Sequence, residues 1–161
     1  INKKIIVICL STHDYLGITE ILNNCNLDKF FIVVRPHPHY FEETLSHFKK
    51  KNKFNYHLLK KISTREIIKK SDFVITGDSS IGYESVIMGK KNVIRLYNEK
   101  YHPLYDYSDG ITTVKNSKIL ENYLNENIKI KNITPKKLIE KFFFRYDKHA
   151  HTRLLNILKK L

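Results

Sequence analysis

Short apolar runs alternate along the chain with segments whose apolar residues recur at helical spacing. The apolar runs predict six strands, at Lys4–Leu10, Phe30–Val34, Phe54–Leu59, Asp72–Thr76, Asn92–Leu96 and Gly110–Val114. The helical spacing predicts helices at Gly17–Asn24, Phe41–Lys50, Thr64–Lys70, Ile81–Met88, Ser117–Asn125, Pro135–Phe144 and His149–Leu161.

The predicted strands are short and almost wholly apolar, which is typical of strands that are covered on both faces. Strands that alternate with helices through short connections favour right-handed crossovers and a parallel sheet. The sequence therefore predicts an α/β fold, with a doubly wound, mostly parallel six-stranded Rossmann-like sheet and a helical C-terminus.

The composition narrows the class of protein. The 161 residues, 42% of them hydrophobic, suffice for a folded domain with its own core. No apolar run approaches the roughly 20 residues of a membrane-spanning helix. Cys9 and Cys25 form no CxxC pair, so we expect neither a disulfide scaffold nor a cysteine zinc site, and a reducing, cytoplasmic location.

The formal net charge is +13, from 29 Lys and Arg against 16 Asp and Glu. Such an excess suggests nucleic acid, anionic lipid or phosphorylated substrates as partners. Most of these cations are lysine, whereas recognition of phosphate and base edges favours the bidentate guanidinium of arginine. We therefore expect no nucleic-acid partner. The basic surface could attract an anionic substrate or hold the protein at the inner face of the cytoplasmic membrane.

The composition changes along the chain. Residues 1–130 contain the alternating strands and helices, and we expect them to form the Rossmann-like domain. Residues 131–161 carry nine Lys or Arg and two acidic residues, and they predict basic helices that pack on this domain or on a preceding lobe. Because a core strand is predicted directly after Ile1, which is not Met, we expect the chain to belong to something longer.

Polar and ionisable residues follow several of the predicted strands. They are Ser11-Thr12-His13-Asp14 after the first strand, Arg35–Tyr40 after the second, Gly77–Ser80 after the fourth and Tyr97–His102 after the fifth. In open parallel sheets, ligands bind beyond the carboxyl ends of the strands, near the point where the strand order reverses. The sequence therefore predicts the functional site at this edge of the sheet.

The turn after the fourth strand, Gly77-Asp78-Ser79-Ser80, leads directly into a helix. Two hydroxyls and the N–H groups at a helix start suit an anion such as phosphate. Gly77 permits a sharp turn, and Glu84, one helical turn beyond Ser80, could accept ribose hydroxyls. The alternative is that one of the serines only caps the helix.

The turn after the second strand reads Arg35-Pro36-His37-Pro38. Prolines on both sides of His37 restrict the backbone, and an imidazole held in this way can donate to a phosphate or transfer a proton. Arg35 could hold a phosphate or pair with Glu42 or Glu43. The alternative for His37 is a surface side chain in a stiff loop.

Motifs for metals and common cofactors are absent from the sequence. The eight histidines include no HExxH, no DxD occurs, and His37 and His39 are poorly spaced as ligands. GxGxxG, GxxxxGK[ST] and GxSxG are also missing. We therefore predict no metal and no cofactor.

His37-Pro38 and Ser79-Ser80, each at the end of a strand, together resemble the HP and SS motifs of bacterial surface-polysaccharide transferases of the GT-B fold. This group includes polysialyltransferase-like sialyltransferases, capsule Kdo transferases and the CDP-glycerol glycerophosphotransferases of teichoic-acid synthesis. The resemblance covers residues 3–100. It implies one half of a GT-B fold, which binds the nucleotide of a CMP- or CDP-linked sugar or polyol phosphate.

The resemblance also implies roles for individual residues. His37 would contact the donor phosphate and act catalytically on the leaving group, Ser79 and Ser80 would hold phosphate oxygens, and Thr12 would face the cleft between two lobes. The candidate substrate-binding residues are thus Thr12, Arg35, His37, Pro38, Gly77, Asp78, Ser79, Ser80 and Glu84. The resemblance further implies a missing N-terminal acceptor lobe with the catalytic base. This chain would then be the donor half of a metal-independent glycosyltransferase, and whether it is active alone stays open.

Two other functions stay open at this point. A UDP-sugar 2-epimerase-like enzyme has a related fold with paired serines in the corresponding turn, and it would draw its cleft residues from Asp14, Glu84 and His102. The other alternative is a non-catalytic nucleotide-binding or interaction domain. No residue pattern separates cytosine from uracil.

Overall fold

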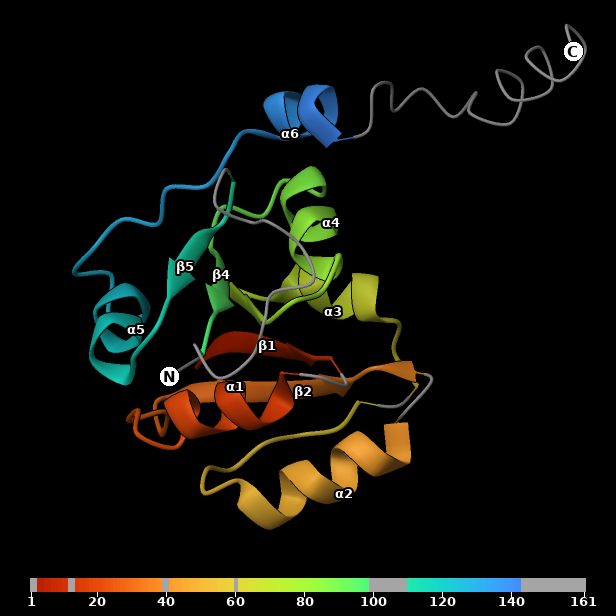
Figure 1. The fold of residues 1–161 in the computed structure, drawn as a ribbon, viewed down its shortest axis with the longest axis vertical. Coiled ribbons are helices and arrows are strands. Elements are labelled where there is room, and N and C mark those ends of the chain that lie inside the picture. The colour runs from red at the N-terminus through yellow and green to blue at the C-terminus, as the bar shows by residue number, and fades with distance from the viewer. Residues whose placement is uncertain (1–2, 12–13, 39–40, 60, 99–109, 143–161) are drawn as a thin grey trace, which may run out of the picture.

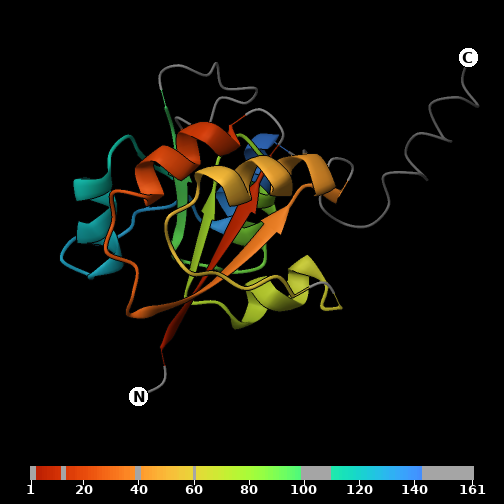
Figure 2. The same ribbon diagram turned by 90° about the horizontal axis from the view of Figure 1, so that it is seen from below.

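The computed structural model describes residues 3–11, 14–38, 41–59, 61–98 and 110–142. In this part of the chain one sheet contains β1 (Lys4–Leu10), β2 (Phe30–Pro36), β3 (Phe73–Thr76), β4 (Val93–Leu96) and β5 (Thr112–Val114). Its order is β2-β1-β3-β4-β5, and every neighbouring pair is parallel. Figure 2 shows the strand arrows running in one direction.

Six helices of the described residues cover both faces of the sheet. They are α1 (Tyr15–Leu22), α2 (Phe41–Lys51), α3 (Thr64–Lys70), α4 (Ile81–Ile87), α5 (Ser117–Leu124) and α6 (Pro135–Phe142). Side chains of α1, α2 and α5 join one buried cluster, and those of α3, α4 and α6 join the other (Figure 1). The predicted α/β architecture with a parallel sheet is therefore confirmed, and it is compatible with a Rossmann-like fold.

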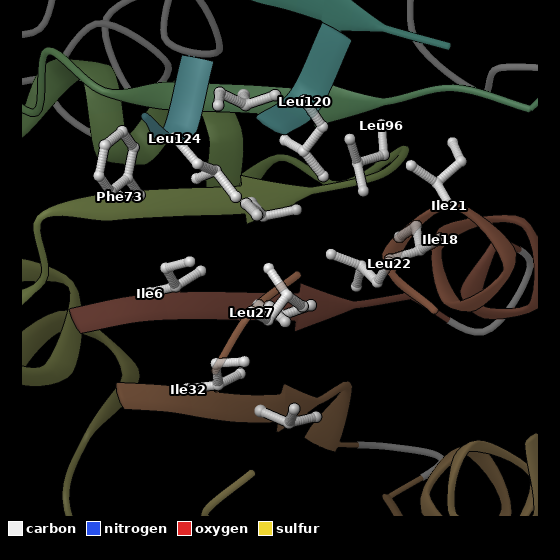
Figure 3. Close-up of a cluster of buried hydrophobic side chains, with 14 of the residues drawn as sticks. Ile6, Ile18, Ile21, Leu22, Leu27, Ile32, Phe73, Leu96, Leu120 and Leu124 are labelled. Carbon is white, nitrogen blue, oxygen red and sulfur yellow. The ribbon is translucent and has the colours of Figure 1, made fainter. Parts of the chain in front are cut away.

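Apolar residues at consecutive positions of each strand build these two clusters. On β1, Ile6 and Ile8 belong to the α1 side and Val7 and Cys9 to the opposite side, all at most 5% exposed. Figure 3 shows Ile6 in the first cluster, with side chains from neighbouring strands and helices. Such double burial explains why the strands show continuous rather than alternating hydrophobicity.

The prediction of a sixth strand at Phe54–Leu59 is wrong for the described structure. This segment forms a single parallel bridge, between His57 and Val33 of β2, with two backbone hydrogen bonds of 2.9 and 3.0 Å. Its alternating apolar side chains are only partly buried, at Phe54, Tyr56 and Leu58. A row of side chains can pack in this way at the sheet edge without a full backbone ladder. The bridge nevertheless lies where a Rossmann sheet has its next strand, beyond β2.

The C-terminal predictions are met in part. α6 begins at the predicted Pro135, and Leu138 is fully buried beside Tyr83 and Val86 of α4. The predicted helix at His149–Leu161 lies outside the described residues. Within the described residues, no helix combines the length and apolar character needed to cross a membrane.

The order in which the chain adds strands to the sheet reverses next to β1. From β1 the chain passes to β2 on one side, and later returns to β3 on the other. The order therefore reverses between β1 and β3, and ligands of open α/β sheets bind beyond the carboxyl ends of strands at such a point. The segments that emerge there include the Ser79-Ser80 turn.

Candidate functional site

A pocket of about 210 Å³ lies at the carboxyl edge of the sheet. One wall is the turn after β2, Arg35–Pro38, and another is Ser79–Ile81 at the start of α4. Cys9 and Leu10 at the end of β1 also line it, with Thr64 and Glu84. The structure thus brings together the two turns that the sequence singled out.

Arg35 is held in this pocket by neutral acceptors. Its Nε and Nη2 donate to Thr64 Oγ1 at 3.2 and 3.1 Å, and its Nη1 donates to the carbonyl of Leu59 at 2.9 Å. Within the described residues no carboxylate forms an ion pair with it, Glu42 and Glu43 included. These bonds use three of the five N–H donors of a guanidinium. Arg35 therefore gives the pocket an oriented, half-buried cation with donors left for an anion.

The paired serines do more than cap α4. Ser80 occupies the N-cap position, yet its side chain makes no capping hydrogen bond and its Oγ lies 3.5 Å from Glu84 Oε1. Ser79 Oγ accepts a long hydrogen bond of 3.4 Å from the Ile81 N–H. Helix capping therefore does not account for the Ser80 hydroxyl, and both serines line the pocket.

Glu84 lines the same pocket and carries an exposed ion pair. Its Oε2 lies 3.6 Å from Nη2 of Arg65, with 39% and 73% of the two side chains exposed. Surface pairs of this kind contribute about 0–1 kcal/mol. Glu84 could therefore exchange Arg65 for the hydroxyls of a ligand at little cost.

The remaining predicted residues are placed as follows. His37 and Pro38 line the pocket and are exposed. Thr12, like His39 and His102, lies outside the described residues. Gly77 and Asp78 are buried and are not part of the pocket lining.

Asp78 has a structural partner on the next strand. Its Oδ1 accepts a 3.0 Å hydrogen bond from Arg95 Nε and forms an ion pair with Arg95 Nη2. Both side chains are 7% exposed, and the Arg95 guanidinium lies 5.1 Å from the centre of the Tyr97 ring. The carboxylate of Asp78 therefore joins the turn to β4.

Asp14 was not among the predicted binding residues, yet it contacts the serine turn. The residue is 7% exposed, and its carboxylate accepts hydrogen bonds from the backbone N–H groups of Asp78 and of Ser11, the latter at 3.3 Å. A Cβ on Gly77 would lie 1.9 Å from Asp14 Oδ2. Gly77 does not have a positive φ, so space for Asp14, not backbone conformation, requires glycine here. An acidic residue just after the first strand was the only sequence signal.

The burial of Asp14 predicts a pH dependence of stability. Burial raises the pKa of its carboxyl above the usual 3.8, so the folded protein binds this proton more tightly than the unfolded chain. The resulting stabilisation is present at acid pH and is lost as pH rises through the raised pKa. In Asp14→Asn, the stability relative to the unsubstituted chain is therefore expected to improve as pH rises above the usual pKa of 3.8.

Urea unfolding of both proteins at several pH values measures this difference. A difference that stays constant over the range would contradict a raised pKa. Asp28→Asn, which changes an exposed carboxylate, serves as the control.

Neither a thiol nucleophile nor a metal cluster emerges from the described geometry. Burial raises the pKa of Cys9 to about 12, although the charge of Arg35 opposes the shift. Cys9 therefore stays a thiol at neutral pH and lacks the thiolate that nucleophilic attack requires. Among the described residues, no three His, Cys, Asp or Glu side chains are grouped so that they could hold a metal ion.

The described pocket thus combines one oriented arginine, two serines, an exposed histidine and Glu84, which contacts Ser80 and forms a surface ion pair with Arg65. Such a set can bind an anion that also carries hydroxyl groups. No protein-family model matches the sequence, and no curated protein matches it.

Proposed function

We propose that the chain binds the nucleotide part of a CMP- or CDP-linked sugar or polyol phosphate. The donor would serve a transferase that builds a capsule, lipopolysaccharide or teichoic-acid-type surface glycan. Arg35 is the observation that carries the phosphate part of this proposal. A half-buried guanidinium oriented by Thr64 and Leu59, and paired with no described carboxylate, suits a phosphate that accepts its remaining donors.

The rest of the pocket supports a phosphate attached to a sugar. Ser79 and Ser80 offer hydroxyls to phosphate oxygens, and Glu84 offers a carboxylate to ribose hydroxyls. The volume of about 210 Å³ is smaller than the roughly 300–1,000 Å³ of pockets that enclose a whole ligand. The pocket therefore suits the phosphate and part of the ribose, with the base and the transferred group outside it.

The proposed chemistry is transfer with a nucleotide phosphate as the leaving group. When the bond to the transferred group breaks, negative charge grows on the phosphate oxygen that is released. Donors already oriented toward that oxygen stabilise the charge, and Arg35, His37 and the two serines are the candidates. In this proposal a preceding lobe supplies the acceptor and the catalytic base, at the cytoplasmic face of the membrane.

One of the three residues that the UDP-sugar 2-epimerase alternative draws on, Asp14, is buried and accepts two backbone N–H groups. Asp14 does not line the pocket, whereas Glu84 does. The preference for a cytidine or a uridine nucleotide separates this alternative from the proposal. A non-catalytic nucleotide-binding domain would use the same pocket, so transferase activity of this domain joined to an acceptor lobe separates a transferase from such a domain.

Calorimetric titration with CMP, CDP, UDP and GDP tests the proposal. We expect saturable binding of a cytidine nucleotide, and a loss of about 10- to 100-fold in affinity in Arg35→Met, because hydrogen bonds to charged groups contribute about 1.5–3 kcal/mol. His37→Ala and Ser79→Ala are each expected to weaken binding to a smaller extent.

Lys118→Met is the control, since it removes one positive charge from an exposed position on α5 outside the pocket lining. Its affinity is expected to stay near that of the unsubstituted chain. No binding of any nucleotide by the folded chain, or equal affinities for Arg35→Met and Lys118→Met, would overturn the proposal. A uridine preference would redirect it to enzymes of UDP-linked sugars.

A further inference from the structure

We infer that Asp14 is a positioning residue of this pocket, which sets where Ser79 and Ser80 present their hydroxyls by holding the N–H of Asp78. The inference rests on the proposed function for the identity of the ligand, whereas the contacts of Asp14 are independent of it. Asp14 itself is not part of the pocket lining. It acts through the turn that follows β3.

The carboxylate of Asp14 does not cap the helix that it precedes. Asp14 occupies the N-cap position of α1, where an aspartate ordinarily accepts an N–H of the first helical turn, but its side chain makes no capping hydrogen bond. It accepts instead from Ser11 and, 64 positions along the chain, from Asp78. The bond to Asp78 links the loop after β1 to the turn after β3, across the point where the strand order reverses.

Gly77 makes this contact sterically feasible. A Cβ at this position would meet Asp14 Oδ2 at 1.9 Å and Asp14 Cγ at 2.3 Å, distances that no packed atoms adopt. The next nearest atom, Ile18 Cδ1 at 2.8 Å, is the flexible end of a side chain. The absence of a side chain at Gly77 therefore mainly makes room for the carboxylate of Asp14.

The same turn is held from its other side. The Asp78 carboxylate accepts from Arg95 on β4, while its N–H donates to Asp14 near α1. The position of residue 78 is therefore fixed through both its backbone and its side chain. Ser79 and Ser80 follow directly, and both residues line the pocket together with Arg35. A shift of the turn moves both hydroxyls relative to Arg35.

Calorimetry with CDP and amide hydrogen exchange together test the inference. Asp14→Asn keeps the side-chain volume but replaces one acceptor oxygen by a donor, and Asp14→Ala removes both acceptors. We expect CDP affinity to fall about tenfold in Asp14→Ala and less in Asp14→Asn, with faster exchange at the amides of residues 78–80. The loss is limited because Asp14→Ala removes the hydrogen bond that positions the turn. The hydroxyls of Ser79 and Ser80 remain, but their alignment with the ligand changes.

Ser71→Ala is the matched control. It removes a buried hydrogen bond, from Ser71 Oγ to the carbonyl of Ile68, just before β3 and thus at the opposite end of that strand. It is expected to reduce stability without changing CDP affinity or exchange at residues 78–80. A merely structural role for Asp14 would give the same pattern as this control, and that result would overturn the inference.

Gly77→Ala provides a second, ligand-independent measurement. It is expected to speed exchange at residues 78–80 in the unsubstituted chain and to add little in the Asp14→Ala background, where the clashing carboxylate is gone. Equal effects in both backgrounds would overturn the inference. If the unsubstituted chain binds none of the nucleotides, the proposed function fails, and the exchange measurements still decide whether Asp14 fixes the turn.

Discussion

Asp78→Ala is expected to lower the free energy of unfolding by about 3–5 kcal/mol, because it removes the carboxylate that faces a buried guanidinium. Asp78 Oδ1 accepts a hydrogen bond of 3.0 Å from Arg95 Nε and forms an ion pair with Arg95 Nη2. Both side chains are only 7% exposed. Transferring a cation from water into such a site is costly. The facing carboxylate offsets that cost, and alanine at position 78 does not.

Urea unfolding with an unchanged m-value measures the loss. Asp28→Ala removes an exposed carboxylate and is expected to change stability by less than about 0.5 kcal/mol. The double variant Asp78→Ala, Arg95→Met is expected to recover part of the loss, because it removes the buried charge as well. An Asp78→Ala protein as stable as Asp28→Ala would contradict the importance of the pair.

Local patterns predicted most of the fold because the relevant signals lie within each segment. The helix predicted at Thr64–Lys70 has the same bounds in the structure, where Ser63 and Glu66 form a capping box at its start. The central strands were predicted from continuous apolar runs, since both faces are buried. A local pattern does not determine whether a segment pairs along its whole length with a neighbouring strand. At Phe54–Leu59 the pattern predicted a strand, but this segment at the sheet edge forms only a single bridge.

The part of the site that lies at the ends of strands could be predicted from the sequence. A parallel sheet brings its carboxyl ends to one edge, so the turns at Arg35 and at Ser79 could be expected to meet. The orientation of Arg35 could not, because Thr64, its acceptor, lies 29 positions away. The structural role of Asp78 depends likewise on Arg95, 17 positions away, and on the distant Asp14. Pairings of this kind are set by the finished fold.

Leu138→Ala is expected to lower the free energy of unfolding by about 2–5 kcal/mol, the range for truncating a buried leucine. Leu138 on α6 is fully buried and belongs to the cluster that contains Tyr83 and Val86 of α4. From the sequence, the basic helices of residues 131–161 were expected to pack on the Rossmann-like domain or on a preceding lobe. Of these, α6 packs on the helix that carries Glu84 and follows Ser80 (Figure 1).

Ile128→Ala, at a side chain that is 42% exposed, is the control and is expected to cost less than about 0.5 kcal/mol. Two-state urea unfolding of both variants measures the difference. If α6 belongs to the core, Leu138→Ala unfolds in one transition at lower urea concentration. An unchanged midpoint would mean that α6 adds nothing to the core, and that α4 holds its part of the pocket without support from residues 131–142.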